Sequence, residues 1–392
     1  MLAPVGAFAQ SDPGAPPANV RMRIGPLFIN PTLALTNAGV DTNVFNDPDS
    51  VVPRKDFTVT VTPATDLWLR FGRSWINAGV KEDIVYYQKY ASQRSVNESY
   101  KVNWVIPLNR LTFNPGVSYI TTRDRPGFEI DLRAQHSEID YNGTIEIRAL
   151  SKTYFGVRGD RQTTKFASDA VFLGSNLQDD LNRTVTTGGF TLRQQVTPLT
   201  SITFDVSREQ DRFELSPSRD TDSTAITGGV KFDPFALIKG SATFGYRDFK
   251  PVSPDVPGYQ GSTVAVDLSY VALGSTRLAV TATRDVQYSY DINQPYYLMT
   301  GVTGSISQQI FGPIDVVARA GTQQLAYRDR AGAVVAVADR VDHVKSYGGG
   351  VGYHMGRDTR IGFNIDQQRR ISAVDSRQYS GLRYGFAVTY GS

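Results

Sequence analysis

Several residue types and patterns are missing or scarce in this chain of 392 residues. It has no cysteine, so neither a disulfide nor a cysteine-bound metal can contribute to its fold. Its three histidines, His136, His343 and His354, are too few for a histidine-rich metal site. No segment approaches the roughly 20 consecutive apolar residues that a membrane-spanning helix needs. The sequence therefore excludes a helical membrane protein and predicts no metal site and no cofactor.

Blocks of like charge and catalytic motifs are also absent. The 41 Lys plus Arg residues are spread evenly among 38 Asp plus Glu residues, which predicts no nucleic-acid partner. His136, Ser137 and Glu138 are consecutive in an expected strand, so their side chains cannot all meet in a catalytic triad. Asp220 and Asp222 begin like a calcium loop that lacks its turn glycine and closing glutamate. We expect neither an enzyme nor a catalytic site.

What the chain does contain is long segments of alternating apolar and polar residues. In residues 141–149, Tyr141, Ile145 and Ile147 lie at odd positions, and polar residues such as Glu146 lie between them. Residues 263–270 and 360–370 repeat this pattern, which is typical of strands with two unlike faces. The alternating segments run to roughly 10 to 16 residues, against about 5 to 6 for an ordinary soluble strand. Strands of this length can cross a membrane.

Short turns recur along the chain, each followed by two alternating segments joined by a longer polar loop. The expected turns are 72–74, 107–109, 150–152, 197–199, 234–236, 273–275, 311–313 and 356–358. Because lipid offers no hydrogen-bond partner to an open sheet edge, the strands must close on themselves. The sequence therefore predicts an all-β fold, a single closed antiparallel transmembrane β-barrel of about 18 strands over residues 27–390, with 16 strands as the alternative.

The alternation is imperfect in several places. The first two strands and residues 320–327 lose their phase, for which we expect β-bulges. Glu82 and Arg284 fall on the lipid side of the expected register. They mark either local slips in register or positions beyond the hydrocarbon layer.

The chain start suggests export from the cytoplasm. Residues 1–9 end in Ala7, Phe8 and Ala9, the small-x-small pattern of a signal-peptide cleavage site, and we interpret them as a residual signal peptide. Residues 10–26 would form a periplasmic N-terminal arm. An even strand number then places both termini on the periplasmic side of a Gram-negative outer membrane. The last strand, 382–390, resembles the C-terminal insertion signal of outer-membrane proteins. The expected partners are outer-membrane lipid and the barrel assembly machinery.

The polar face of the strands should line a water-filled lumen, which barrels of 16 to 18 strands are wide enough to hold. The predicted lumen-lining residues carry charges of both signs or an amide. They are Lys81, Asp83, Lys101, Asn103, Glu146, Arg148, Arg158, Asp160, Lys231, Asp267, Arg319, Asp366, Arg370 and Arg383. For any single member, the alternative role is in a structural ion-pair ladder.

All three tryptophans, Trp68, Trp75 and Trp104, lie close to expected short turns. Amphipathic aromatic side chains collect at membrane interfaces, so these residues are predicted to form a periplasmic aromatic girdle. Trp68 shares its parity with Arg70, which leaves open a lumen-facing role in stacking against sugars. In the segment 347–353, YGGGVGY, we expect the neighbouring aromatic rings to cover the bare glycine backbone.

One stretch carries a family resemblance. In INPTLALTNAGVDTNVFND, the matching residues are Pro31, Gly39, Asp41, Asn43, Val44 and Phe45. This stretch resembles the opening of the outer-membrane β-barrel porins associated with exopolysaccharide export loci. The resemblance implies a conduit for polysaccharide export that works with a periplasmic polysaccharide co-export protein, and it transfers no catalytic residue. Val40 and Thr42 replace an aromatic and an acidic residue of the family pattern.

Two functions follow as hypotheses. A polymer export channel should have a lumen free of inward-folded loops, whereas a general or substrate-selective diffusion porin for small solutes normally narrows its pore with a long loop. The longest expected loops are 166–180, with an apolar tip, and 249–260. We expect export, with a channel of low conductance that the 166–180 loop closes. A surface adhesin would need larger loops, and a TonB-type transporter would need a plug domain.

Overall fold

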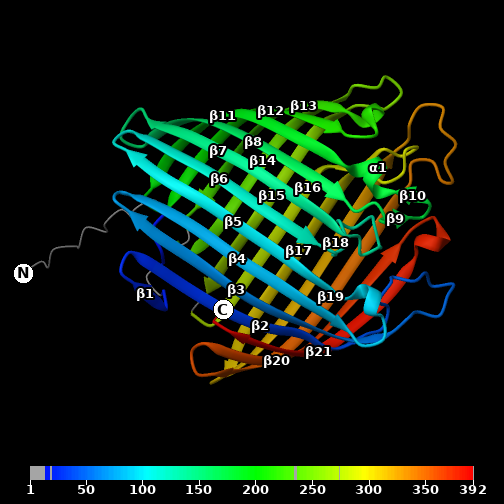
Figure 1. The fold of residues 1–392 in the computed structure, drawn as a ribbon, viewed down its shortest axis with the longest axis horizontal. Coiled ribbons are helices and arrows are strands. Elements are labelled where there is room, and N and C mark those ends of the chain that lie inside the picture. Colours follow the sequence, from blue (N-terminus) through cyan, green and yellow to red (C-terminus); the bar gives the residue numbers. More distant parts are fainter. Residues whose placement is uncertain (1–13, 18–19, 234–235, 273, 392) are drawn as a thin grey trace, which may run out of the picture.

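A computed structural model describes residues 14–17, 20–233, 236–272 and 274–391, and the predicted strands form one barrel (Figure 1). The first nine barrel strands are β2 (Leu27–Asp41), β3 (Asp56–Phe71), β4 (Ser74–Tyr87), β5 (Ser95–Leu108), β6 (Leu111–Thr122), β7 (His136–Arg148), β8 (Thr153–Phe166), β11 (Arg183–Thr197) and β12 (Thr200–Phe213). The other nine are β13 (Thr221–Phe232), β14 (Ile238–Pro251), β15 (Tyr259–Ala272), β16 (Thr276–Tyr288), β17 (Tyr296–Phe311), β18 (Ile314–Arg328), β19 (Val341–Met355), β20 (Thr359–Ile371) and β21 (Tyr379–Tyr390).

Each strand pairs antiparallel with its neighbours in the chain, and β2 pairs with β21 to close the sheet. The described strands thus confirm the prediction of a closed antiparallel barrel of 18 strands. Short turns lie at one end, here called the turn end, and the longer connections lie at the other, the loop end (Figure 1). Pro234, Phe235 and Leu273, in two predicted turns, lie outside the described residues. No helix in the described part of the chain is long and apolar enough to span a bilayer.

Shorter elements lie at the two ends of the barrel. They are β1 (Met22–Ile24), β9 (Val171–Phe172), β10 (Ser175–Asn176), α1 (Leu177–Leu181) and the 3-10 helices η1 (Ala91–Gln93), η2 (Pro217–Arg219) and η3 (Asp375–Arg377). β1 forms a hairpin with β2 at the turn end, and all the others belong to connections at the loop end.

The two faces of the strands follow the sequence alternation. Large apolar side chains such as Phe190 and Phe244 are exposed on the outer wall, at 70% and 60% of their surface. Their polar neighbours along the strands point inward. An apolar outer wall around a polar interior is the arrangement that suits a barrel surrounded by lipid.

The seam between β2 and β21 uses the residues that carry the family resemblance. The register shifts between Leu35 and Ala38, a bulge in the first predicted strand, and the backbones then approach closely at Gly39. A Cβ atom at Gly39 would lie 2.0 Å from the carbonyl oxygen of Tyr384, so a side chain is excluded there. Beyond it, Arg383 Nη2 donates to Asp41 Oδ2 at 2.6 Å. Asn43 Nδ2 donates to the Ser380 carbonyl at 3.0 Å.

The expected bulge in residues 320–327 is absent, since the pairing of β18 with β17 and β19 is regular there. The alternation fails for another reason: Leu325 and Tyr327 face inward and are fully buried. An apolar inward face means that something other than water covers it at the loop end.

Register is also regular at the two charged residues that the sequence placed on the lipid side. Glu82 of β4 lies opposite Glu98, and Arg284 of β16 lies opposite Thr300. Both lie in the half of their strands nearest the loop end, so neither is a slip in register.

The predicted signal peptide, residues 1–9, lies outside the described residues. In the part of the N-terminal arm that is described, Arg21 forms an ion pair with Asp358, in the turn between β19 and β20. Gly391 donates its N–H to the carbonyl of the same Asp358. The two ends of the described chain therefore meet at the turn end.

Candidate functional site

One connection folds inward and crosses the barrel opening at the loop end. It is residues 123–135, between β6 and β7, here called the lid loop. Phe128 packs on an apolar cluster of the opposite wall, formed by Tyr297, Leu325, Tyr327 and Val344. The inward apolar face of β18 is thus explained, because the lid loop covers it.

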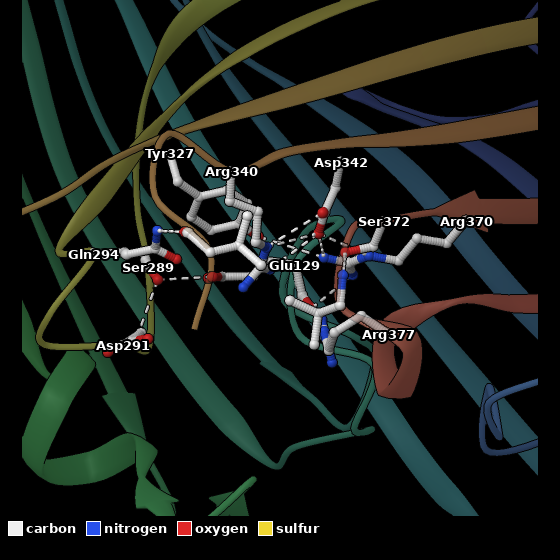
Figure 2. Close-up of polar contacts among 12 residues, drawn as sticks. Glu129, Ser289, Asp291, Gln294, Tyr327, Arg340, Asp342, Arg370, Ser372 and Arg377 are labelled. Carbon is white, nitrogen blue, oxygen red and sulfur yellow. Dashed lines mark hydrogen bonds and ion pairs between the residues drawn. The ribbon is translucent and has the colours of Figure 1, made fainter. Parts of the chain in front are cut away.

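Arg370 of β20 fastens the middle of the lid loop (Figure 2). Its side chain is fully buried, and Nη1 donates to the carbonyl oxygens of Phe128 and Glu129, each at 3.0 Å. The same guanidinium forms ion pairs with Asp342 at 2.5 Å and Asp131 at 3.4 Å. Arg370 was predicted to line an aqueous lumen, but the structure places it beneath the lid loop, away from solvent.

Arg377, on η3, adds a second fastening. Its Nη1 lies 2.9 Å from Asp131 Oδ2, and its Nη2 donates to the Glu129 carbonyl. Arg340 completes the group, because it pairs with Asp342 at 2.9 Å and stacks on the Tyr327 ring. We call Arg340, Asp342, Arg370, Arg377 and Asp131 the latch. Removing one partner of a buried ion pair usually costs about 3 to 5 kcal/mol, so the latch holds the lid loop firmly.

Glu129 occupies the centre of this arrangement (Figure 2). Its carboxyl group accepts hydrogen bonds from Ser289 Oγ at 2.7 Å and from the Tyr290 N–H at 3.1 Å. Burial raises the pKa of Glu129, and the Ser289 hydrogen bond and the nearby Arg377 and Arg340 only partly oppose that effect. Protonation of this carboxyl group therefore favours the buried position.

The connection between β8 and β11 lies over the lid loop. Its Phe172, Leu177 and Leu181 form a buried apolar cluster with Ile130 and Tyr290. The apolar tip expected in the 166–180 loop is thus used in packing, although Val171 and Leu173 remain exposed. The inner closure itself is made by residues 123–135, which are not among the loops that the sequence singled out.

On its own side of the barrel the lid loop is anchored by two further arginines. Arg125 Nη2 donates to the carbonyl of Val44 at 2.8 Å, and Arg133 Nη2 donates to Ser95 Oγ at 3.1 Å. Asn46 Nδ2 donates to Asp131 at 3.1 Å. The resemblance motif, through Val44 and its neighbour Asn46, therefore supports both the barrel seam and the lid loop.

Beneath the lid loop is a cavity of about 510 Å³. Its walls carry basic and acidic side chains together: Lys81, Arg125, Arg183, Asp83 and Glu138, with His136 beside them. Lys81 and Asp83 form an ion pair at 2.9 Å. A cavity of this size and mixed charge suits a small polar solute better than an apolar one.

Other predicted lumen residues form ion pairs along the inner wall. The pairs are Lys101 with Asp66 at 3.5 Å, Arg158 with Asp205 at 2.8 Å, Arg193 Nε with Glu146 at 2.8 Å, Arg319 with Asp366 at 2.6 Å and Arg383 with Asp41 at 2.6 Å. Arg148, Asp160, Lys231 and Asp267 have no ion-pair partner among the described residues. Asn103 lies on the same inward face as these residues, opposite Gly116 of β6.

Several of these pairs join strands that are not neighbours. Arg319 on β18 and Asp366 on β20 meet across β19, above Gly348, where a Cβ atom would lie 2.0 Å from Asp366 Oδ1. Arg360 and Asp315 meet in the same way above Gly352. The glycines of the YGGGVGY segment thus leave room for ion pairs inside the barrel, a role that differs from the expected covering by aromatic rings.

The tryptophans divide between the two faces. Trp104 is exposed on the outer wall, as a girdle residue would be. Trp75 is only 4% exposed, packs against Phe28 and lies under the Arg70 guanidinium on the inner face, in contrast to the expectation. Trp68 lies opposite Phe28 and shares the face of Arg70. Gly14 of the N-terminal arm passes against Trp75 and Val105.

Sequence reasoning missed Glu129, Asp131, Ser289, Arg340, Asp342 and Arg377. One signal was present in the lid loop: Phe128, Ile130 and Leu132 alternate with Glu129 and Asp131 in a segment that follows Pro126 and Gly127. Such alternation gives an extended loop two unlike faces, and both are buried here: Ile130 among apolar side chains, Glu129 and Asp131 among polar groups. The residues of the far wall that contact the lid loop have no comparable pattern around them in the sequence.

Solved structures with a similar fold include a porin. A BenF-like porin from Pseudomonas fluorescens Pf-5 has 10% sequence identity and a TM-score of 0.50, over 94% of this chain and 98% of that one. OccK2 (OpdF) from Pseudomonas aeruginosa, solved in complex with glucuronate, has 9% identity and a TM-score of 0.46, over 92% and 97%. At such identities the likeness shows the fold alone.

A search of curated proteins found no match. The family model described as "Putative beta-barrel porin 2" matches residues 15–391, nearly the whole described chain. The match agrees with a closed barrel of 18 strands, an apolar outer wall and a charged interior. The chain therefore belongs to this family of β-barrel porins and is an outer-membrane channel.

Proposed function

We propose that this protein is a diffusion porin for small polar solutes, with an entrance narrowed by a latched loop. The observation that carries the proposal is the lid loop, which crosses the barrel opening and is bound to the far wall by Arg370 and Arg377. A diffusion porin needs a constriction that selects by size. A polymer conduit needs an unobstructed bore.

The cavity under the lid loop supports the proposed solute class. Ligand sites commonly enclose about 300 to 1,000 Å³, and this cavity of about 510 Å³ falls in that range. Basic residues such as Lys81 and Arg183 line it together with acidic ones such as Glu138. Uncharged or zwitterionic solutes with several hydroxyl groups would find hydrogen-bond partners of both kinds there.

The proposal includes an orientation and a path. The turn end, where Arg21 and Gly391 meet, faces the periplasm, and the loop end faces the cell exterior. The inward residues without ion-pair partners among the described residues, Arg148, Asp160, Lys231 and Asp267, line the aqueous path together with Asn103 and the wall ion pairs. Insertion depends on the barrel assembly machinery.

Polysaccharide export is the second candidate, supported by the sequence resemblance. For export, the latch and the apolar cluster around Ile130 and Leu177 would have to open together each time a polymer passed. A periplasmic polysaccharide co-export protein would then supply the opening signal at the turn end. The geometry favours the diffusion porin, because the closed arrangement buries ion pairs that a sugar chain cannot replace.

Liposome swelling with sugars of increasing length tests the proposal. Wild-type protein should admit monosaccharides and disaccharides and exclude longer chains. A variant in which residues 127–132 are replaced by a glycine-serine linker of equal length should admit the longer chains as well. The matched control is the same replacement in residues 333–338, where exposed and half-buried residues alternate in the connection between β18 and β19.

A gene deletion separates the two candidate functions. Slower uptake of small sugars, with normal surface polysaccharide, supports the diffusion porin. Loss of surface polysaccharide with unchanged uptake would instead establish export. A wild-type protein that passes no small solute in liposomes would also contradict the diffusion porin.

A further inference from the structure

In the described strands, the charged residues on the outer wall lie in the loop-end half of the barrel. On β8, Phe155 and Val157 face outward near the turn end, whereas the outward positions near the loop end are Arg161 and Lys165. On β12, Ile202 and Phe204 are followed by Arg208 and Arg212. The same change from apolar to charged occurs on other strands, at Lys250, Arg284, Lys345, Arg369, Glu82, Glu98, Asp222 and Asp248.

The densest part of this ring spans the adjacent strands β8, β11, β12, β13 and β14. Strand register places Arg161 in one row with Thr186, Gln210, Asp222 and Lys250. Arg212 lies opposite Thr184, and Arg208 lies opposite Thr224. We call Arg161, Lys165, Arg208, Arg212 and Lys250 the outer basic patch.

The outer basic patch carries more positive charge than its neighbours neutralise. Five basic side chains are accompanied by three acidic ones. Asp222 and Asp220 pair with Arg212 at 2.7 Å and 3.9 Å, and Asp248 pairs with Lys250 at 2.6 Å. Arg208 reaches Asp222 only at 3.7 Å, and its side chain is 67% exposed. Among the described residues, Arg161 and Lys165 have no ion-pair partner, and both are exposed.

The position of the patch indicates its surroundings. A basic residue facing lipid costs about 2 to 4 kcal/mol at the bilayer midplane and about 0 to 1 kcal/mol near the interface. A strand tilted by about 40° rises about 2.6 Å per residue, so a strand like β8 passes through the roughly 25 Å apolar band before its end. Lys165, in the last third of β8, therefore reaches the headgroup layer. Arg161, four residues earlier, lies near the edge of the apolar band, and its long side chain can extend to the same layer.

We propose that the outer basic patch binds the phosphate groups of lipid headgroups in the leaflet around the loop end, specifically those of a phosphorylated glycolipid. Arginine guanidinium groups bind phosphate oxygens in a bidentate manner, and Lys165 and Lys250 add point charges. The threonine hydroxyls between them, at Thr184, Thr186 and Thr224, can donate to sugar or phosphate oxygens. The proposal rests on the orientation proposed above, with the loop end at the cell exterior, and is independent of the solute that crosses the channel.

Native mass spectrometry of the purified full-length protein in detergent tests this binding. The probe is bisphosphorylated lipid A, compared with dephosphorylated lipid A and with inorganic phosphate. Wild-type protein should retain the bisphosphorylated lipid and should bind neither of the other two at the same concentration. The variant Arg161→Gln/Lys165→Gln/Arg208→Gln/Arg212→Gln should lose at least tenfold in apparent affinity.

A matched control removes the same charge from the inward face, where Lys239 lies opposite Ser269 and Arg277 lies opposite Val271. This variant, Arg148→Gln/Lys231→Gln/Lys239→Gln/Arg277→Gln, should retain lipid binding. A smaller variant, Arg161→Gln/Lys165→Gln, removes only the two unpaired residues and should lose about threefold, so the test remains valid if the larger variant fails to fold. Arg161→Lys/Arg208→Lys/Arg212→Lys should keep most of the affinity. Heat-modifiable gel mobility verifies folding in each case.

Three results would overturn the proposal. The first is equal retention of the bisphosphorylated lipid by wild-type protein and both patch variants. The second is equal binding of the dephosphorylated lipid, which would remove the role of phosphate. The third is a patch variant that binds the lipid as well as wild-type protein does but has lost self-association in sedimentation. That result would assign the patch to contacts between protein copies.

Discussion

Arg370 of β20 and Asp342 of β19 form an ion pair at 2.5 Å that is completely buried, with neither side chain exposed. Two charges excluded from water this thoroughly are stable only while their remaining hydrogen bonds are satisfied. The backbone carbonyls of Phe128 and Glu129 complete that set for Arg370. The hydrogen bonds of this buried pair are therefore complete only when the lid loop is closed.

The first prediction concerns this latch. Arg370→Ala should destabilise the closed lid loop by about 3 to 5 kcal/mol, because Asp342 loses its buried partner. The open state should then be visible as higher conductance in planar bilayers and as faster tryptic cleavage at Arg125 and Arg133 of the lid loop. Arg319→Ala, which breaks an ion pair lower on the wall, is the control and should leave cleavage unchanged. Equal cleavage in both variants would show that the latch does not hold the loop.

The second prediction is a pH dependence set by Glu129. In the closed state burial raises the pKa of this carboxyl group, whereas in an open loop the pKa returns to about 4.3. The closed state then binds the proton more tightly, so its stability is greatest below the ordinary value and is lost as pH rises through the raised value.

The other charged groups that act on Glu129 are Arg377, Arg340 and Arg219, and they favour the carboxylate. Channel opening in planar bilayers should therefore increase in wild-type protein as the pH rises above the ordinary glutamate value and through the raised one. Glu129→Gln should reduce this increase, while Glu138→Gln, in the cavity wall, should leave it intact. A wild-type profile that falls with rising pH would reverse the assignment.

The third prediction tests the ion pairs that cross glycines. Gly348→Leu should separate Arg319 from Asp366, because any Cβ at this position collides with the carboxylate. We expect a loss of roughly 1 to 3 kcal/mol in barrel stability, in the range of overpacked sites. Gly349→Ala, on the outward face, meets its nearest atom at an ordinary 3.5 Å and should have little effect. Urea-dependent gel mobility would compare the two, and a similar midpoint in both would remove the role of the crossing pair.

The fourth prediction compares the two faces of β16. Val280→Arg places a charge on the outer wall and should impair assembly by about 2 to 4 kcal/mol if the site is near the bilayer midplane. Thr281→Arg points into the lumen beside Asp267, which lies opposite it, and should be tolerated. Folding into lipid vesicles, monitored by heat-modifiable mobility, gives both values. Better assembly of the Val280 variant would mean that the faces are inverted.

The fifth prediction concerns orientation. A peptide tag inserted after Val334, a 91% exposed residue in the connection between β18 and β19, should bind antibody on intact cells. A tag in the turn at Gly312 should bind antibody only after the outer membrane is permeabilised. Antibody binding to the Gly312 tag on intact cells would place the turn end outside.

The barrel could be predicted from the sequence because its determinants are local. The period-two alternation in segments such as 141–149 specifies the two faces, and short turns such as Gly72–Arg73 specify the strand number. The lid loop could not be predicted, because Arg370 and Glu129 meet across the whole barrel. Leu325 and Tyr327 break the alternation of apolar outward and polar inward residues, because protein rather than water covers their inward side chains.

The prediction for Trp75 was wrong for a related reason. A tryptophan near a turn suits the membrane interface, but Phe28 and Arg70 provide an alternative surface inside the barrel. Only the register of β3 and β4 decides between the two faces, and a change of one residue in that register reverses the result. The sequence indicated ion pairs along the wall as an alternative. It could not predict that they pass above glycines, because that arrangement depends on three strands at once.

The seam between β2 and β21 has a consequence for the order of assembly. Asp41 and Arg383 are separated by 342 positions in the chain, so their ion pair cannot form until the last strand has been made and delivered. Until then β2 has an open edge, which in other sheets is a site of misassociation. The assembly of this protein should therefore wait on its final strand, and the Asp41–Arg383 contact marks the moment at which the nascent barrel becomes complete.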